Sequence, residues 1–185
     1  MSASDFTTLD NVKGWLGLDP SQTTDDALLT RLITAASGFI RTWCNRDFVS
    51  QSYIETRNGT GARMLALANT PITEVDSVSV DGAPIPAGGL QTPGFTFSAT
   101  MLVLNGYRFT RGLANVQITY VAGYATVPDE IEQACIELVS FRYRERARIG
   151  VSSEAMAAST SSYQVRDVPP SVATLLNLYK KVVPV

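Results

Sequence analysis

Side chains able to perform acid–base or nucleophilic chemistry are few in this sequence of 185 residues. The chain has no histidine, which excludes Ser–His and Cys–His nucleophile pairs and histidine metal ligands. The adjacent carboxylates Asp25 and Asp26 precede a long segment with an apolar stripe, where acidic side chains suit the positive end of a helix. Catalysis by this pair is the alternative to that helix-end role. We therefore expect no catalytic, cofactor-binding or metal-binding residues, and no enzyme.

Two further patterns with possible chemistry favour structural roles. Cys44 and Cys135 are too few and too far apart for a zinc knuckle or a CxxC redox site. Each lies among apolar neighbours at helical spacing, which indicates a small buried side chain. Gly59-Thr60-Gly61 is too short for a phosphate-binding loop and leads into a predicted strand, so it indicates a turn.

A series of arginines occupies every second position near the end of a predicted helix: Arg142, Arg144, Arg146 and Arg148. They can form a solvated helix end that complements the helix dipole and pairs with Glu145. They can instead contact another subunit, or the phosphates of DNA. The formal net charge of −2 argues against tight DNA binding, because proteins that grip phosphates usually have a basic excess.

The elements that position these residues follow from the spacing of apolar side chains. Steps of three and four predict helices over residues 7–16, 25–45, 128–149 and from 170 onward. Side chains suited to cap the first three are Thr7, Thr23 or Thr24, and Thr126. The third helix has one stripe at Ile131, Ala134, Cys135 and Leu138, and a second, offset stripe at Ile136, Val139 and Tyr143. Two stripes predict a helix covered on two sides.

Residues 49–127 have a different composition, rich in Gly, Thr, Val and Pro. Short alternating runs predict strands near residues 51–56, 64–67, 78–80, 101–104 and 116–121. Dipeptides that favour tight hairpins stand between them: Asn58-Gly59, Asp81-Gly82 and Asn105-Gly106. This pattern is typical of an antiparallel β module.

The order of elements predicts an α+β fold, in which the N- and C-terminal helices form a helical bundle with an inserted antiparallel β module. The predicted divisions are residues 1–48, 49–127 and 128–185. Residues near 151–162 are rich in Ser and Ala, and we expect a mobile loop there. No apolar run approaches the roughly 18 residues of a membrane span, and the N-terminus lacks a signal-peptide pattern. We therefore expect the protein to be made in a cytoplasm and to have no membrane partner.

Three stretches, in this order and spacing, resemble the head–tail connector (head-completion adaptor) family of long-tailed phages and prophages. The first is Val12-Lys13-Gly14-Trp15-Leu16-Gly17-Leu18, followed by Asp25-Asp26-Ala27-Leu28-Leu29 and then Trp43-Cys44-Asn45-Arg46-Asp47-Phe48. The second is Tyr120-Val121-Ala122-Gly123-Tyr124 with Val127-Pro128-Asp129-Glu130-Ile131, Ala134 and Tyr143-Arg144-Glu145-Arg146. The third is Pro169-Pro170 before Leu175-Leu176 and Tyr179-Lys180. The smallest members of that family are nearly all helical, whereas this chain devotes about 80 residues to strands.

The resemblance implies a structural virion protein, made in the host cytoplasm and placed in the virion neck. It implies a ring of identical subunits, usually a dodecamer, docked on the portal protein and presenting a surface to a tail or stopper protein. Double-stranded DNA would pass through this ring without tight binding. Candidates for a subunit or portal interface are Arg142, Arg144, Arg146, Arg148, Ile136, Val139 and Tyr143. The alternatives are a DNA-binding packaging accessory protein and a soluble α+β interaction domain of unrelated role.

Overall fold

The computed structural model of the chain describes residues 5–89, 91–146, 153–156, 159–162 and 168–181. The fold is α+β, as predicted, with four helices and antiparallel sheets in the described parts of the chain. The chain divides into a helical unit, Met1–Arg46 with Val127–Val185, and a β unit, Asp47–Thr126. None of the helices described is both long enough and apolar enough to cross a membrane.

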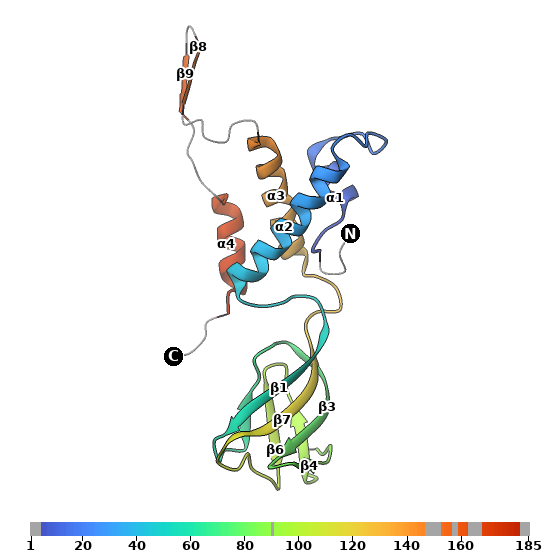
Figure 1. The fold of residues 1–185 in the computed structure, drawn as a ribbon, viewed down its shortest axis with the longest axis vertical. Helices are drawn as coiled ribbons and strands as arrows, with labels where there is room; N and C mark the ends of the chain where they lie inside the picture. Colours follow the sequence, from blue (N-terminus) through green and yellow to red (C-terminus); the bar gives the residue numbers. More distant parts are fainter. Residues whose placement is uncertain (1–4, 90, 147–152, 157–158, 163–167, 182–185) are drawn as a thin grey trace. The chain divides into compact units, whose positions relative to one another are not determined.

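The helical unit contains α1 (Leu9–Leu16), α2 (Asp26–Cys44), α3 (Asp129–Glu145) and α4 (Pro170–Tyr179) (Figure 1). α3 contacts each of the other three helices. Its buried side chains come from both predicted stripes: Ile131, Ala134, Cys135, Ile136, Leu138, Val139, Ser140 and Tyr143. The prediction that this helix is covered on two sides is therefore confirmed.

The start of α1 is fixed by a threonine one position later than predicted. The Thr8 hydroxyl accepts a hydrogen bond from the Asn11 amide at 3.2 Å and so caps the helix. The Thr7 hydroxyl instead donates to Glu132 Oε1 at 3.0 Å. The prediction of Thr7 as the cap was wrong because a tertiary contact with α3 occupies that side chain.

The other two predicted caps are also replaced. α2 begins after Asp25 and α3 after Pro128, and neither of these residues makes a side-chain cap hydrogen bond. Thr23, Thr24 and Thr126 therefore do not hold the N-cap positions. Proline suits the beginning of a helix because the first amide groups have no intrahelical acceptor.

The β unit contains two antiparallel sheets (Figure 1). The four-stranded sheet has the order β1-β7-β3-β4, with bounds Gln51–Gly59, Gly112–Ala122, Ile72–Val80 and Ala83–Ile85. The three-stranded sheet has the order β2-β6-β5, with bounds Met64–Ala66, Met101–Asn105 and Gly94–Phe97. One cluster of buried apolar side chains from both sheets forms the core of the unit.

Side chains along β7 alternate between this core and an outer face. Ile118 and Tyr120 are fully buried, whereas Gln117 and Thr119 point to the opposite side of the strand. On the core side of β7, the Tyr120 hydroxyl donates to Glu55 Oε2 at 2.6 Å, so this buried polar group has a hydrogen-bond partner.

The three predicted hairpin dipeptides have different outcomes. Asn105-Gly106 ends β6, but residues 106–111 separate Asn105 from the start of β7 at Gly112, so it forms no two-residue hairpin. Asp81-Gly82 forms the turn between β3 and β4, with Val80 paired to Ala83 and both turn residues at positive φ, as a tight two-residue hairpin requires. Asn58-Gly59 instead lies inside β1. A side chain at Gly59 would overlap the Thr110 carbonyl oxygen, so this glycine permits the main chain at Thr110 to approach the end of β1 closely.

The two ends of the β unit are joined to one another. The Ser50 amide donates to Tyr124 O at 3.1 Å, and the Tyr124 amide donates to Phe48 O at 2.9 Å. The Phe48 and Tyr124 rings stack with their centroids 6.4 Å apart. Gly123 has φ of 119°, and a side chain there would collide with the Val49 backbone. The chain thus enters and leaves this unit at one place.

Part of the predicted mobile loop has regular structure. β8 (Ser153–Met156) and β9 (Ser159–Ser162) form an antiparallel hairpin. The other residues of the 151–162 segment lie outside the described part of the chain. Small polar residues without apolar alternation give no strand signal, which is why the sequence did not predict this hairpin.

Candidate functional site

Two of the arginines at the end of α3 contact aromatic rings of their own chain. The Arg142 guanidinium lies over the Phe39 ring, 5.2 Å from its centroid. The Arg146 guanidinium lies over the Tyr143 ring at 3.8 Å and donates to the Tyr143 carbonyl oxygen at 2.5 Å. Such cation–π contacts fix the side chains against the helical unit. These arginines therefore have intramolecular partners.

The carboxylate of Asp25 lies at the same end of α3. The Tyr143 hydroxyl donates a short hydrogen bond to Asp25 Oδ2. This hydrogen bond, followed by burial, raises the pKa of Tyr143. Asp26, its neighbour in sequence, forms an ion pair with Lys13. The two acids thus have separate partners, and this arrangement does not resemble a catalytic carboxylate pair.

The second apolar stripe of α3 is already covered within the chain. Ile136 is 7% exposed, Val139 is 0% exposed and Tyr143 is 9% exposed. Their surface is used in packing α3 against its neighbouring helices. A role for these three residues in an interface stays a prediction, and it would have to act through the packing of α3.

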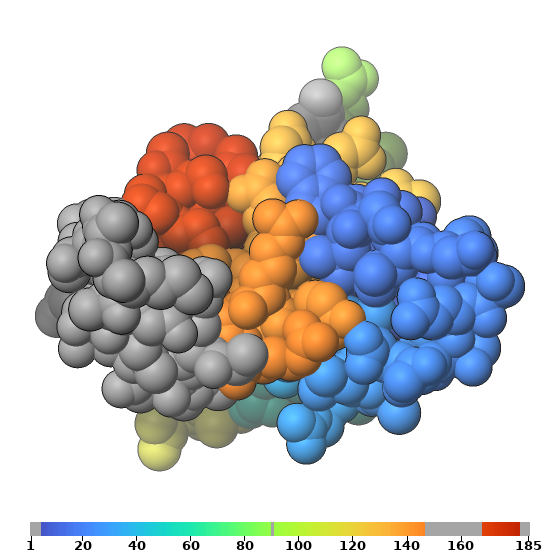
Figure 2. Space-filling model, turned by 90° about the horizontal axis from the view of Figure 1, so that it is seen from above, coloured from blue at the N-terminus to red at the C-terminus, as the bar shows by residue number. Residues whose placement is uncertain are grey.

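The remaining arginine of the described segment, Arg144, is exposed and lines a shallow groove. Arg148 lies outside the described residues. The groove has a volume of about 400 Å³ and joins α1, α3 and the start of α4. Its lining residues are Trp15, Glu137, Ser140, Phe141, Arg144, Glu145 and Pro169. Figure 2 views the helical unit from the end where α3 finishes, and the orange end of α3 is exposed there beside the blue N-terminal segment.

Trp15 is the most informative residue of this groove. It is 52% exposed although it belongs to an amphipathic helix whose apolar side is buried at Val12. Exposed tryptophan beside arginine is typical of protein–protein interfaces. Trp15 was not predicted as a site residue, although its sequence position gives a signal: it falls off the stripe formed by Leu9, Val12 and Leu16.

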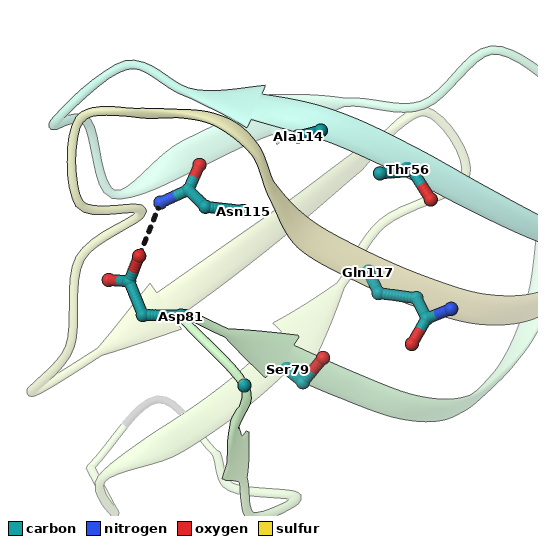
Figure 3. A pocket seen from close by; sticks show the side chains of 7 residues that line it. Thr56, Ser79, Asp81, Ala114, Asn115 and Gln117 are labelled. Atoms are coloured by element: carbon teal, nitrogen blue, oxygen red, sulfur yellow. Dashed lines mark hydrogen bonds between the residues drawn. The ribbon is translucent and has the colours of Figure 1, made fainter.

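A second hollow lies on the outer face of the four-stranded sheet (Figure 3). It has a volume of about 330 Å³. Thr56, Ser79 and Gln117 line it from three adjacent strands, and Asn115 holds Asp81 at its edge with a hydrogen bond of 2.9 Å. Among the described residues that line it, this carboxylate is the only charged group.

Asp81 is engaged in structure rather than in chemistry. It accepts a short hydrogen bond from the Thr110 hydroxyl and the one from Asn115. These hydrogen bonds lower the pKa of Asp81. Among the described residues, no group of three His, Cys, Asp or Glu side chains is arranged to hold a metal ion.

Three solved structures with a similar fold come from gene transfer agent particles. A chain in the neck of an empty gene transfer agent particle, computed with C6 symmetry, is 18% identical with a TM-score of 0.60, over 97% of this chain and 92% of that one. A chain in the virion of the native gene transfer agent particle is 16% identical with a TM-score of 0.63, over 97% of this chain and 92% of that one. A chain in the neck of the native particle, computed with C12 symmetry, is 17% identical with a TM-score of 0.60, over 100% of this chain and 95% of that one.

No curated protein matches this chain in sequence. A family model does match, over residues 5–182, and its description is "Head completion protein". The match spans both units and all four helices, and the family is one of structural proteins rather than enzymes. It confirms the resemblance that the three sequence stretches indicated. The chain belongs to the head completion protein family.

Proposed function

We propose that this protein is a structural subunit of the virion neck, where a ring of its copies joins the portal vertex of the head to the tail. The observation that carries this proposal is the family match over residues 5–182. Similar folds in gene transfer agent necks computed with C6 and C12 symmetry support a ring of identical subunits. The ring, a dodecamer by the family's usual number, would extend the DNA channel and meet a tail or stopper protein on its far side.

The charge of the chain suits a channel through which DNA must slide. The formal net charge is −2. Proteins hold DNA tightly when many basic side chains displace the counterions of its phosphates, and this chain has no excess of basic residues to do so. Arg142 and Arg146 have their guanidinium groups on rings of their own chain. We therefore assign them to support of the helical unit rather than to retention of DNA.

The helices before and after the β unit would act as one bundle, the rigid body of each subunit. α3 contacts α1, α2 and α4, and fully buried side chains such as Ile40, Leu138 and Leu176 come from three of these helices. A rigid body is needed because an interface repeated around a ring must keep one geometry. The groove with Trp15 and Arg144 is its candidate docking surface toward a neighbouring subunit or the portal.

Removal of the gene from a particle-producing strain tests the proposal. Particles made without the protein should contain heads that lack tails, and the intact gene supplied in trans should restore complete particles. In complemented particles, a tag on the subunit should locate to the head–tail junction by electron microscopy. Tailed particles formed without the protein, or a tag distributed over the capsid or the tail, would contradict the proposal.

A further inference from the structure

Three exposed arginines of the β unit gather at one end, where the Asp81 carboxylate also lies and accepts hydrogen bonds from Thr110 and Asn115. Two connections, between β1 and β2 and between β6 and β7, lie together at one end: the Gly61 amide donates to Phe109 O at 2.6 Å, and the Phe109 amide donates to Ala62 O at 3.0 Å. These paired loops bring together arginines that are distant in sequence. We call this end the arginine tip: Arg63, Tyr107, Arg108, Arg111 and Leu113.

The arginines of the tip have no acidic partner within the described part of the chain. Arg108 and Arg111 each donate to a loop carbonyl, of Gly61 at 3.3 Å and of Thr60 at 3.4 Å. These contacts hold the guanidinium groups at the tip while leaving other N–H groups to solvent. All three arginines of the tip are exposed.

Large apolar side chains are exposed beside these charges. Leu113 is 85% exposed and Tyr107 is 38% exposed. Arginine with an aromatic and an aliphatic neighbour is the composition of a protein-binding surface. A site that only follows a phosphate backbone gains nothing from an exposed leucine.

The complementary surface lies on the outer face of the four-stranded sheet, at the other end. The register places Ser52, Val121 and Glu74 in one row across β1, β7 and β3, and Ile54, Thr119 and Ser77 in the next. Directly paired residues share a face. Ile54 is 72% exposed, so this face presents an apolar side chain on β1 and an acidic one on β3, with β7 between them. Asp76 is the exposed extra residue of the β-bulge between Val75 and Ser77, next to these rows. We call this surface the acidic face: Ile54, Glu74, Asp76 and Val121.

Glu74 and Asp76 are both exposed, and within the described residues neither has a basic partner. β7 runs from the tip at Gly112 to the level of Glu74 at Val121. At ~3.3 Å per residue the two surfaces are roughly 30 Å apart. They belong to one sheet unit with a single core, so a tip cannot fold back onto the acidic face of its own chain.

We infer that the arginine tip of one subunit docks on the acidic face of the β unit of a second copy of this chain. Arg63, Arg108 and Arg111 would meet Glu74 and Asp76, and Leu113 would meet Ile54 and Val121. Two different surfaces of one molecule that complement each other make a head-to-tail contact, which closes into a ring when the rotation permits. The inference rests on the proposed neck function, because it names the contact by which β units would join around that ring.

Charge reversal in full-length subunits tests the pairing. The tip variant is Arg63→Glu with Arg108→Glu and Arg111→Glu, and the face variant is Glu74→Arg with Asp76→Arg. In particles that contain one variant, we expect the yield of complete neck rings to fall about tenfold or more, since like charges then face each other. A chain with both sets should recover ring formation, because its reversed tip meets a reversed face. Arg31→Glu, at an exposed position of α2, is the matched control and should leave the yield unchanged.

A second measurement does not depend on the folding of multiply charged variants. Chains with Arg108→Cys and Glu74→Cys should give a ladder of covalent oligomers when assembled rings are treated with a short bismaleimide. Arg31→Cys with Glu74→Cys should not.

The outcomes separate the inference from the proposed function. Normal ring yields in both reversal variants, or only monomers after cross-linking of assembled rings, would overturn the inference while leaving a neck ring in place. Loss of DNA retention by the tip variant, with no effect of the face variant and no recovery in the combined chain, would assign the tip to nucleic acid and also overturn it. Absence of the wild-type subunit from the neck would instead refute the proposed function.

Discussion

The Lys13 ammonium group lies 2.6 Å from Asp26 Oδ1, with the lysine side chain only 4% exposed. It also donates to the carbonyl oxygens of Gln22 at 2.8 Å and Pro20 at 3.3 Å. One buried cation therefore closes the connection between α1 and α2: it forms an ion pair with Asp26 and donates to two main-chain carbonyl groups. Removal of the charge would leave these acceptors with water as their only replacement partner.

Lys13→Met tests this role. The variant keeps the apolar stem and loses the donor, and we expect the free energy of unfolding to fall by about 2 kcal/mol, the usual cost of leaving buried partners unsatisfied. Urea unfolding followed by circular dichroism measures it. Arg31→Met, at an exposed position of α2, should change stability by less than about 0.5 kcal/mol. Equal stability of the two variants would show that the ion pair contributes nothing.

Tyr120 gives the β unit a dependence on alkaline pH. Burial, followed by its hydrogen bond to Glu55, raises the pKa of Tyr120 to about 12 from a usual value of 10.0. The folded state therefore holds this proton more tightly than the unfolded state does. The resulting stability is fully present below pH 10 and is lost as the pH rises through about 12. Tyr120→Phe should weaken this alkaline loss, whereas Tyr107→Phe, at an exposed position, should not. Urea unfolding at a series of pH values compares the variants, and identical profiles would contradict the assignment.

The two cysteines should be unreactive in the folded protein. Burial raises the pKa of Cys44 and of Cys135 to about 11, from 9.0. At neutral pH this lowers the thiolate fraction about 100-fold, before the steric protection of two buried side chains is added. We expect a thiol reagent to modify the native chain at least about 100-fold more slowly than the chain in urea. A Ser52→Cys variant, exposed on β1, should react at the rate of a free thiol. Fast modification of the native wild type would show that the helical unit opens readily.

Substitutions in the groove of the helical unit should reduce particle assembly without reducing the stability of the subunit. Trp15→Ala and Arg144→Glu change exposed side chains, so we expect unfolding free energies within about 0.5 kcal/mol of the wild type and fewer complete particles. Arg142→Glu and Arg146→Glu remove cation–π contacts and should cost about 1 kcal/mol in stability. Leu178→Ala, at a 78% exposed position of α4, is the control. Normal assembly with Trp15→Ala and Arg144→Glu would remove the groove from the candidate interfaces.

Local patterns in the sequence were sufficient to predict the positions of the helices and of one hairpin turn. The predicted apolar face of α2 comprises Leu28, Leu29, Leu32, Ile33, Ala36, Phe39, Ile40, Trp43 and Cys44. Five of these are buried in the structure, whereas Leu28, Leu32, Phe39 and Trp43 are half-buried. Asp81-Gly82 predicts the β3–β4 turn because both positions tolerate positive φ. The prediction failed where a distant contact decides the outcome. The Thr7 hydroxyl is occupied by Glu132, 125 positions later.

The candidate surfaces were harder to predict from the sequence because they too depend on contacts between distant residues. The arginines at 142 to 148 are conspicuous because they are adjacent in sequence, yet the rings that hold two of them belong to tertiary packing. Arg63 and Arg108 meet at the arginine tip only because two loops form main-chain hydrogen bonds with each other. β4 and β5 were not predicted, because Pro84 and Gly94 are residues that weaken a strand pattern.

The joined ends of the β unit have an evolutionary consequence. Phe48 and Tyr124 lie side by side at the base of the unit, so the chain departs from the helical unit and returns to it across a short gap. A segment with such ends can be gained or lost in a single genetic event without displacing the helices that flank it. The sequence of the inserted segment can therefore change, as the surfaces that it meets change, while the flanking helices keep theirs.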